Sequence, residues 1–111
     1  MMMTIVESKA FTEGITALLS DAEYAEFQQE LAANPERGDV IPGLGGLRKI
    51  RLASKGKGKR GGARVIYLLI LPSEVIYLFY VYSKGDMTDL APEQKKRLRG
   101  AVEEIKAQFT K

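Results

Sequence analysis

Apolar and polar positions follow two different periods along this chain, and the first 35 residues show both of them. Residues 3–8 are β-branched in their middle and predict a first strand. Residues 9–19 bring four apolar side chains, from Phe11 to Leu19, onto one side of a predicted helix. A strand followed by a helix is therefore expected at the amino-terminal end.

A second helix is predicted directly after the first. Ser20 and Glu23 have the spacing of a capping box, in which each side chain bonds the backbone amide of the other residue. Tyrosine, phenylalanine and leucine recur at helical spacing after them, and Pro35 ends the pattern because the residue before a proline resists helical geometry. The two helices are expected to form a hairpin.

Residues 36–47 are interpreted as a loop because they contain Pro42 and several glycines. The next segment, residues 47–53, alternates like a strand. Leu47, Lys49 and Arg51 are expected on one face, with Arg48, Ile50 and Leu52 on the other.

Two nearly continuous apolar runs follow, over residues 63–71 and 74–82, as expected of strands covered on both faces. The short connection through Pro72 and Ser73 predicts an antiparallel hairpin. A last helix is predicted over residues 92–109, with a proline in its first turn and apolar side chains at helical spacing.

The predicted order is strand, helix, helix, strand, strand, strand, helix. It indicates an α+β fold with a small, mostly antiparallel four-stranded sheet, an amino-terminal helical hairpin and a carboxy-terminal helix. At 111 residues the chain is expected to form one domain over residues 1–111.

The amino-acid composition limits which metal sites, disulfides and catalytic groups the chain can have. The chain has no cysteine and no histidine, so a disulfide framework or a structural zinc site is not expected, and any catalysis needs another proton carrier. Neither a membrane-spanning segment nor a secretion signal is recognisable, so a cytoplasmic location without membrane contact is expected. We expect no cofactor.

Charge is strongly polarised along the chain. Residues 1–47 hold two basic and eight acidic side chains, whereas residues 48–64 hold eight basic and none acidic. Such a segment suggests an anionic partner. Nucleic acid is favoured, because the P-loop pattern is absent and a membrane surface prefers a basic amphipathic helix. A solvated loop that opposes edge aggregation is the simpler alternative for residues 54–62.

Flexible cations in this segment are candidates for binding nucleic acid through its phosphates. Tyr67 and Tyr77 are expected to pack in the core, whereas Tyr82 ends its strand and can reach a substrate. The candidate phosphate-binding cations are Arg48, Lys55, Lys57, Lys59 and Arg60.

Residues 38–68, with "GGLRKIR" and "KGKGKRGG", and residues 80–98, with "YVYSKGDMTDL", resemble the RelE/HigB superfamily of toxins from bacterial toxin–antitoxin pairs. The likeness is greatest to the HigB-type branch. It implies a RelE-like fold and a ribosome-dependent endoribonuclease that cleaves mRNA in the A site, beside ribosomal RNA. It also implies a cognate antitoxin, expected to carry a helix-turn-helix DNA-binding domain.

The resemblance also implies site residues. Lys49 and Arg51 match paired cations on one strand, Arg64 matches an arginine on the next, and Lys84 matches a basic position after the last strand. Some members carry a catalytic tyrosine near the carboxy terminus, where this chain has none beyond Tyr82. Tyr82 is assigned that role by proximity.

RNA is cut without metal or histidine when its own 2′-hydroxyl attacks the adjacent phosphate. Arg64 is expected to stabilise the transition state, and Lys49 and Arg51 are expected to add positive electrostatic potential at the reacting phosphate. Lys84 or Tyr82 would then transfer protons, giving a 2′,3′-cyclic phosphate and a 5′-hydroxyl.

Three alternatives remain open. The first is a non-catalytic RNA- or ribosome-binding basic module, and the second is an interaction protein whose basic face docks an acidic partner. The third is a metal-dependent nuclease that uses Asp86 and Asp89. Asp89 is equally well explained as a charge leading into the last helix.

Overall fold

A five-stranded sheet forms the centre of the computed structural model, which describes residues 3–52, 63–83 and 91–109. Its elements follow one another in the order expected, with one short addition. In chain order they are β1 (Thr4–Glu7), α1 (Lys9–Leu18), α2 (Asp21–Ala33), β2 (Asp39–Val40), β3 (Leu47–Leu52), β4 (Ala63–Ile70), a 3₁₀ turn (Leu71–Ser73), β5 (Val75–Ser83) and α3 (Pro92–Phe109).

The strands lie in the order β1-β5-β4-β3-β2. The neighbours among β2, β3, β4 and β5 pair antiparallel, and only β1 runs parallel to its neighbour, β5. The predicted α+β class and mostly antiparallel sheet are therefore confirmed. The predicted number of four strands is wrong, because the glycine- and proline-rich loop contains β2. This strand is two residues long and exposed, so it carries no apolar alternation that would indicate it.

Both helices of the amino-terminal hairpin begin at a serine cap. The Ser8 hydroxyl accepts a hydrogen bond from the Phe11 amide at 3.0 Å and donates one to the Phe79 carbonyl at 2.7 Å. Ser20 and Glu23 form the predicted capping box, with bonds of 2.9 and 3.1 Å. The first cap thus also ties α1 to β5, which fixes the helix over the sheet.

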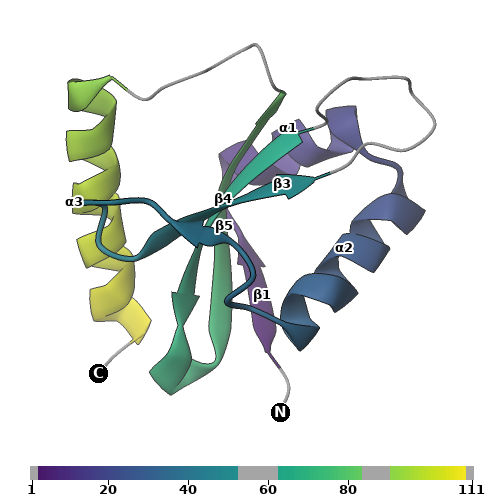
Figure 1. Cartoon of the computed structure of the whole chain (residues 1–111), viewed down its shortest axis with the longest axis horizontal. Coiled ribbons are helices and arrows are strands. Elements are labelled where there is room, and N and C mark those ends of the chain that lie inside the picture. The colour runs from purple at the N-terminus through teal and green to yellow at the C-terminus, as the bar shows by residue number, and fades with distance from the viewer. Residues whose placement is uncertain (1–2, 53–62, 84–90, 110–111) are drawn as a thin grey trace.

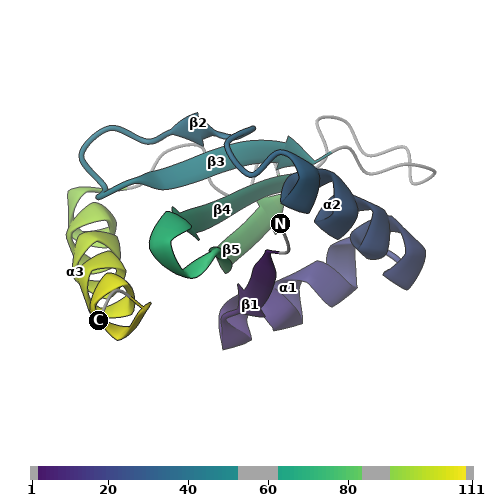
Figure 2. The same cartoon turned by 90° about the horizontal axis from the view of Figure 1, so that it is seen from below.

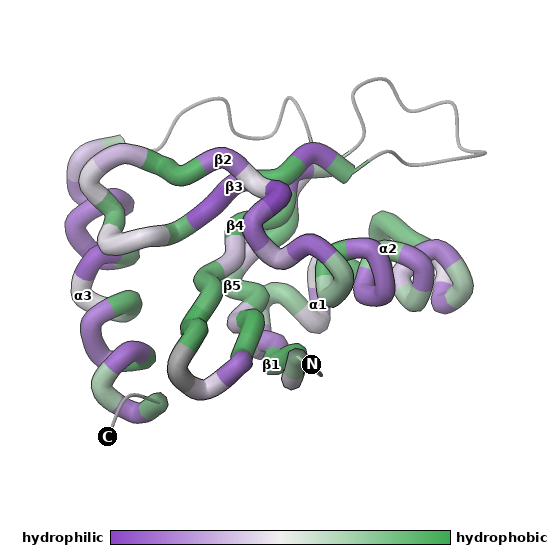
Figure 3. The backbone as a smooth tube through the Cα atoms, turned by 60° about the horizontal axis from the view of Figure 1, so that its bottom comes forward, coloured by the Kyte–Doolittle hydropathy of each residue, from purple (hydrophilic) through white to green (hydrophobic). Residues whose placement is uncertain are grey.

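Helices cover both faces of the sheet, with α1 and α2 on one side and α3 on the other (Figures 1 and 2). Apolar residues are concentrated in the central hairpin of β4 and β5 (Figure 3). Alternate residues of β4 serve two cores. Val65 and Tyr67 pack with Phe11, Phe27 and Leu31 of the helical hairpin, whereas Ile66, Leu68 and Ile70 pack with Val102 of α3. The prediction of strands covered on both faces is confirmed.

The predicted hairpin of β4 and β5 contains an irregularity. Ile66 lies opposite Tyr80 and Tyr67 opposite Leu78, so Phe79 is an extra residue in β5 and forms a β-bulge. The connection through the 3₁₀ turn ends at Glu74, whose φ of 54° lies in the left-handed region. The bulge changes which β5 side chains reach the α3 face.

The last helix packs across one half of its face of the sheet. Val102 is fully buried there, and Leu98, Ile105 and Phe109 pack partly buried around the same core. Gly45, at φ +70°, lies so close that a Cβ would come within 3.0 Å of the Val102 side chain. In the described part of the chain, none of the helices combines the length and apolar character that crossing a membrane requires.

Candidate active site

Three predicted site residues form a row across the three central strands. In the register of the sheet, Arg51 of β3 lies directly opposite Arg64 of β4, which in turn lies opposite Tyr82 of β5. Residues directly opposite one another project from the same face of a sheet. We call Arg51, Arg64 and Tyr82 the central row.

The central row lies on the α3 face, beyond the half that α3 covers. The alternation of β3 and β4 places Leu47 and Ile66 on this face, and both belong to the core under α3. Lys49 and Arg51 are exposed, and Arg64 is half-buried. The predicted division of the residues 47–52 between the two faces is confirmed. Together, Lys49, Arg51 and Arg64 make this half of the face cationic.

The two arginines of the row are a like-charge pair at the closest cross-strand position. Directly opposite residues have Cβ atoms roughly 4.5–5.5 Å apart, and like charges there disfavour the folded sheet. An anion bound between the two guanidinium groups would reverse this effect. Phosphate suits the position, because the planar guanidinium group donates two parallel hydrogen bonds to its oxygens.

An acidic side chain lies across the sheet from one of these cations. Asp39 of β2 lies directly opposite Lys49 of β3. Residues 48–64 hold no acid of their own, so this acid comes from the segment predicted as a loop, where the structure has β2. Opposite charges at such a position contribute roughly 0.2–1 kcal/mol to the stability of the pair.

Arg48 projects from the opposite face of β3 to Lys49. Its Nη1 atom donates hydrogen bonds to the carbonyl oxygens of Glu36, at 3.0 Å, and Gly38, at 2.7 Å. The side chain therefore holds the segment that leads into β2. Its role in binding RNA or the ribosome stays a prediction, and the structure gives it this local contact in addition.

Tyr67 is a packing residue, as expected. Its ring is fully buried, its hydroxyl donates to the Pro35 carbonyl at 2.8 Å and it accepts from the Gly38 amide at 2.8 Å. Burial raises the pKa of this hydroxyl, although the Gly38 amide and the charge of Arg48 act in the opposite direction. Tyr67 is thus held protonated within the fold and is no candidate base.

Tyr77 also packs as expected, with its ring centroid 4.8 Å from that of Phe79. Tyr82 is half-buried, close to the end of β5, and contacts the core under α3. Five other predicted residues lie outside the described part of the chain, so their roles stay predictions. They are Lys84, Lys55, Lys57, Lys59 and Arg60.

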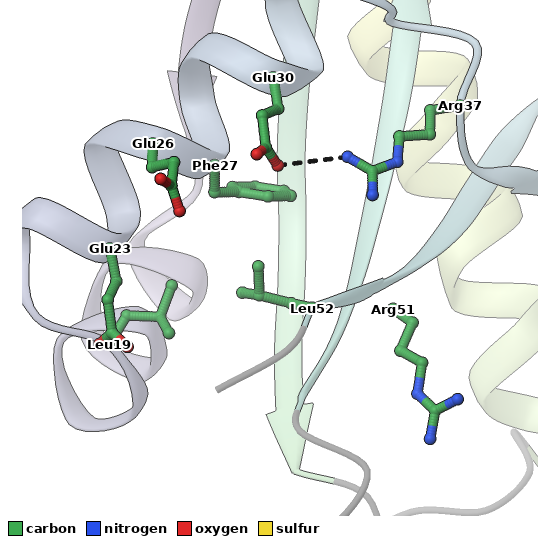
Figure 4. Close-up of a pocket in the computed structure, with 8 residues that line it drawn as sticks. All are labelled: Leu19, Glu23, Glu26, Phe27, Glu30, Arg37, Arg51 and Leu52. Carbon is green, nitrogen blue, oxygen red and sulfur yellow. Dashed lines mark hydrogen bonds and ion pairs between the residues drawn. The ribbon is translucent and has the colours of Figure 1, made fainter. Parts of the chain in front are cut away.

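Acidic side chains gather on the other side of the molecule. A pocket of about 440 Å³ is lined by Glu23, Glu26 and Glu30 of α2, with Phe27 and Leu52 at its apolar wall. Glu30 forms an ion pair with Arg37 at 3.3 Å, and Arg51 lies at the pocket's edge (Figure 4). The three glutamates make this pocket unfavourable for a polyanion, except at the edge where Arg51 lies.

A metal-dependent nuclease needs a cluster of metal ligands. Within residues 3–52, 63–83 and 91–109, no three acidic side chains gather in a way that could hold a metal ion. Asp86 and Asp89, the pair that this alternative would use, are not among those residues.

Comparison with known proteins identifies the family of this chain. Residues 5–110 match the family described as the RelE toxin of the RelE / RelB toxin–antitoxin system. The chain belongs to the RelE toxin family. This confirms the predicted superfamily, whereas the narrower HigB-type branch stays a prediction.

Two solved structures of RelE proteins share this fold. A mutant of the Escherichia coli toxin RelE in the free state has a TM-score of 0.60 at 16% identity, covering 92% of this chain and 99% of that one. The RelE–RelB complex from the archaeon Pyrococcus horikoshii has a TM-score of 0.52 at 25% identity, covering 78% of this chain and 100% of that chain. The RelE-like fold predicted from the sequence is confirmed.

One residue that borders the site cannot be found from the sequence. Asp39 lies in a segment that the sequence predicts as a loop, and the only signal for β2 is the valine and isoleucine that follow Asp39. Tyr80 also borders the site, because it projects from the same face as Tyr82, two residues away. Its position depends on the bulge at Phe79, which a continuous apolar run does not reveal.

Proposed function

We propose that this chain is a ribosome-dependent mRNA endoribonuclease, the toxin of a toxin–antitoxin pair, which cleaves mRNA in the A site and so inhibits translation. Its membership of the RelE toxin family supports the toxin assignment. The observation that carries the chemistry is the central row, in which Arg51 and Arg64 lie opposite one another beside Tyr82.

The proposed reaction is the attack of an RNA 2′-hydroxyl on the adjacent phosphorus, with departure of the 5′-oxygen. Negative charge builds up on the phosphate oxygens in the transition state. Arg64, central in the row, would hold two of these oxygens, and Arg51 and Lys49 would add positive field. The products are a 2′,3′-cyclic phosphate and a 5′-hydroxyl, and no metal ion is needed.

Two protons have to move in this reaction. The attacking 2′-hydroxyl loses one, and the leaving 5′-oxygen gains one. Tyr82 is assigned to one of these transfers because it lies directly opposite Arg64 in the row, and Lys84 is the proposed partner in the other. A tyrosine–lysine pair is a weaker acid–base system than histidine near neutral pH.

A weak acid–base pair makes alignment of the substrate important. In-line attack requires the 2′-oxygen, phosphorus and 5′-oxygen to be collinear, which free RNA rarely satisfies. The ribosome would supply this geometry by holding mRNA in the A site, and fixed orientation alone accelerates reactions by large factors. Little cleavage of free RNA is therefore expected.

The proposal includes a protein partner and a location. The Pyrococcus horikoshii relative was solved as a RelE–RelB complex. By analogy, this chain would be held inactive by a cognate antitoxin, which we expect to carry a helix-turn-helix domain. Because its substrate is ribosome-bound mRNA, the toxin would act in the cytoplasm.

The test is a translation reaction reconstituted from purified components, with cleavage sites mapped by primer extension. The wild-type chain is expected to cut mRNA within codons, and Arg64→Ala to lose at least 100-fold in cleavage rate, the order reported for loss of one transition-state donor. Cosedimentation with ribosomes should stay within about threefold of wild type. Arg37→Ala, which removes an exposed arginine on the acidic side, is the matched control and should cut normally.

Two of the alternatives predict different results. A non-catalytic binding module would leave all transcripts intact while still cosedimenting with ribosomes. A metal-dependent nuclease would lose its activity on pre-treatment of the toxin with EDTA, followed by removal of the chelator. Intact transcripts with wild-type protein at low ionic strength would overturn the proposal.

A further inference from the structure

An open pocket of about 370 Å³ lies between β5 and the amino-terminal half of α3. Phe79 and Tyr80 line it from β5, and Leu98 and Ala101 line it from α3. Gln94 and Arg97, one helical turn before, supply its polar groups. The start of α1 closes the remaining side, where the Ser8 hydroxyl is bonded to the Phe79 carbonyl.

The β-bulge explains why two aromatic side chains meet at this pocket. In a regular strand, Phe79 and Tyr80 would project from opposite faces. The extra residue in β5 instead leaves both on the α3 side, because Phe79 packs with the core under α3 and Tyr80 lies opposite Ile66 of that same core. The pocket is therefore a built feature of the sheet.

The walls suit a flat aromatic ligand. Tyr80 is 38% exposed, one of the most exposed large apolar side chains in the described residues, and presents its ring to solvent. Leu98 and Ala101 form an apolar wall across from it, and Gln94 and Arg97 offer hydrogen-bond donors at the rim. Single-stranded RNA bases are bound in this way, by stacking on aromatic rings and by hydrogen bonds to their edges.

The pocket adjoins the proposed catalytic residues. Tyr80 and Tyr82 project from the same face of β5, two residues apart, which is roughly 6.6 Å along a strand. Lys49 lies in the same register row as Tyr80, on the far side of Ile66. A nucleotide next to the one whose phosphate lies in the central row could thus place its base here.

We propose that this pocket binds the nucleobase adjacent to the cleaved phosphodiester and gives the enzyme its base preference. This inference rests on the proposed function for the identity of the RNA, and it adds a specificity site to it. Charge favours RNA over a basic peptide, because α3 carries four cations, Lys95, Lys96, Arg97 and Arg99, in its amino-terminal half.

The first experiment measures binding without cleavage. Short RNA oligonucleotides with a 2′-deoxy substitution at the cut site are titrated against the purified chain, and tyrosine fluorescence is followed. Tyr80→Ala is expected to weaken binding roughly tenfold, as the loss of one base stack does, and Tyr80→Phe to keep it. Leu71→Ala, which shortens an exposed apolar side chain at the far end of the hairpin, is the control and should bind normally.

The second experiment maps cleavage sites on the ribosome. Tyr80→Ala should still cut mRNA but lose its preference among the four bases next to the cut. Ala101→Leu, which fills the pocket while keeping Tyr80, should have the same effect. Circular dichroism and urea unfolding establish that both variants are folded.

The outcomes separate the two proposals. If wild-type protein cuts no mRNA but Tyr80→Ala still weakens oligonucleotide binding, the proposed function fails and the base pocket stands. If both pocket variants bind RNA and choose cleavage sites like wild type, the pocket inference is overturned while the nuclease stands. If they lose only their affinity for a copurified antitoxin, the pocket binds that protein and the inference is equally overturned.

Discussion

Tyr67 connects the core to the segment before β2, which the sequence predicts only as a loop. Its ring fills the core between the sheet and the helical hairpin, and its hydroxyl bonds the backbone of Pro35 and Gly38 just before β2. Arg48 binds the Gly38 carbonyl from β3. These bonds fix the segment from which Asp39 approaches Lys49, so packing and site geometry depend on one another here.

Gly38 should therefore tolerate no side chain. A Cβ at this position would lie 2.8 Å from Tyr67 Cε1 and 3.1 Å from the Lys49 carbonyl oxygen. We expect Gly38→Ala to lower the free energy of unfolding by about 1–3 kcal/mol, the usual cost of overpacking. The measurement is equilibrium unfolding in urea.

Gly100→Ala is the matched control for this variant. A Cβ there meets nothing within 4 Å, and the position lies inside α3. The change is expected to raise stability by about 0.5–1 kcal/mol, because alanine favours a helix over glycine. Equal stability of Gly38→Ala and wild type would mean that the Pro35–Gly38 segment moves away from Tyr67 at little cost.

Part of the site could be predicted from single residues. The period of two in residues 47–52 gives the faces of Lys49 and Arg51 without any structure. It does not give the partner of Arg51, because the loop between the strands sets the register, and its length alone leaves several registers open. The contact of Arg48 with two carbonyls was also beyond prediction, since it depends on how the preceding loop folds back.

At the scale of elements, the helices and strands that could be predicted from the sequence are those with a clear apolar periodicity or a capping motif. The α2 capping box, the hairpin of β4 and β5 and the span of α3 follow from local patterns. Three features do not: β2, which has two residues, the parallel pairing of β1 with β5, and the bulge at Phe79. Each of these is decided by tertiary packing, which local spacing does not encode.

One hydrogen bond between two elements makes the free energy of unfolding depend on pH in the alkaline range. The Tyr24 hydroxyl of α2 donates a hydrogen bond to the Glu7 carboxylate of β1. Burial, followed by this bond and the charge of Glu7, raises the pKa of Tyr24 above its ordinary value. The folded state therefore favours the neutral phenol. Its contribution is fully present below about pH 10, the pKa of an unfolded tyrosine, and is lost as pH rises further.

Tyr24→Phe is expected to make the free energy of unfolding fall less steeply above about pH 10 than in wild type. Urea unfolding at a series of pH values measures this slope. Glu7→Gln keeps the burial but removes the charge, so its slope should lie between the other two. Identical slopes for all three proteins would show that the pKa of Tyr24 is not raised.

At the scale of the whole molecule, the fold separates charges that the sequence holds in successive segments. The acidic first part of the chain supplies the glutamates of α2 on one side of the sheet, and the strand cations Lys49 and Arg64 lie on the other, with Arg51 at the edge of the acidic pocket. An approaching polyanion is attracted to one face and repelled from the other. The molecule is thereby oriented before any specific contact forms.

This separation predicts how salt affects RNA binding. For single strands, each neutralised phosphate contributes about −0.7 to the slope of log affinity against log salt concentration, so eight contacts at residues 48–64 would give roughly −6. The double variant Lys49→Gln/Arg51→Gln should flatten the slope by roughly 1.4. Lys9→Gln/Arg37→Gln removes the same charge from the acidic region and should leave it unchanged. Equal flattening by both would show that only net charge matters, and that the cations of β3 do not contact RNA phosphates.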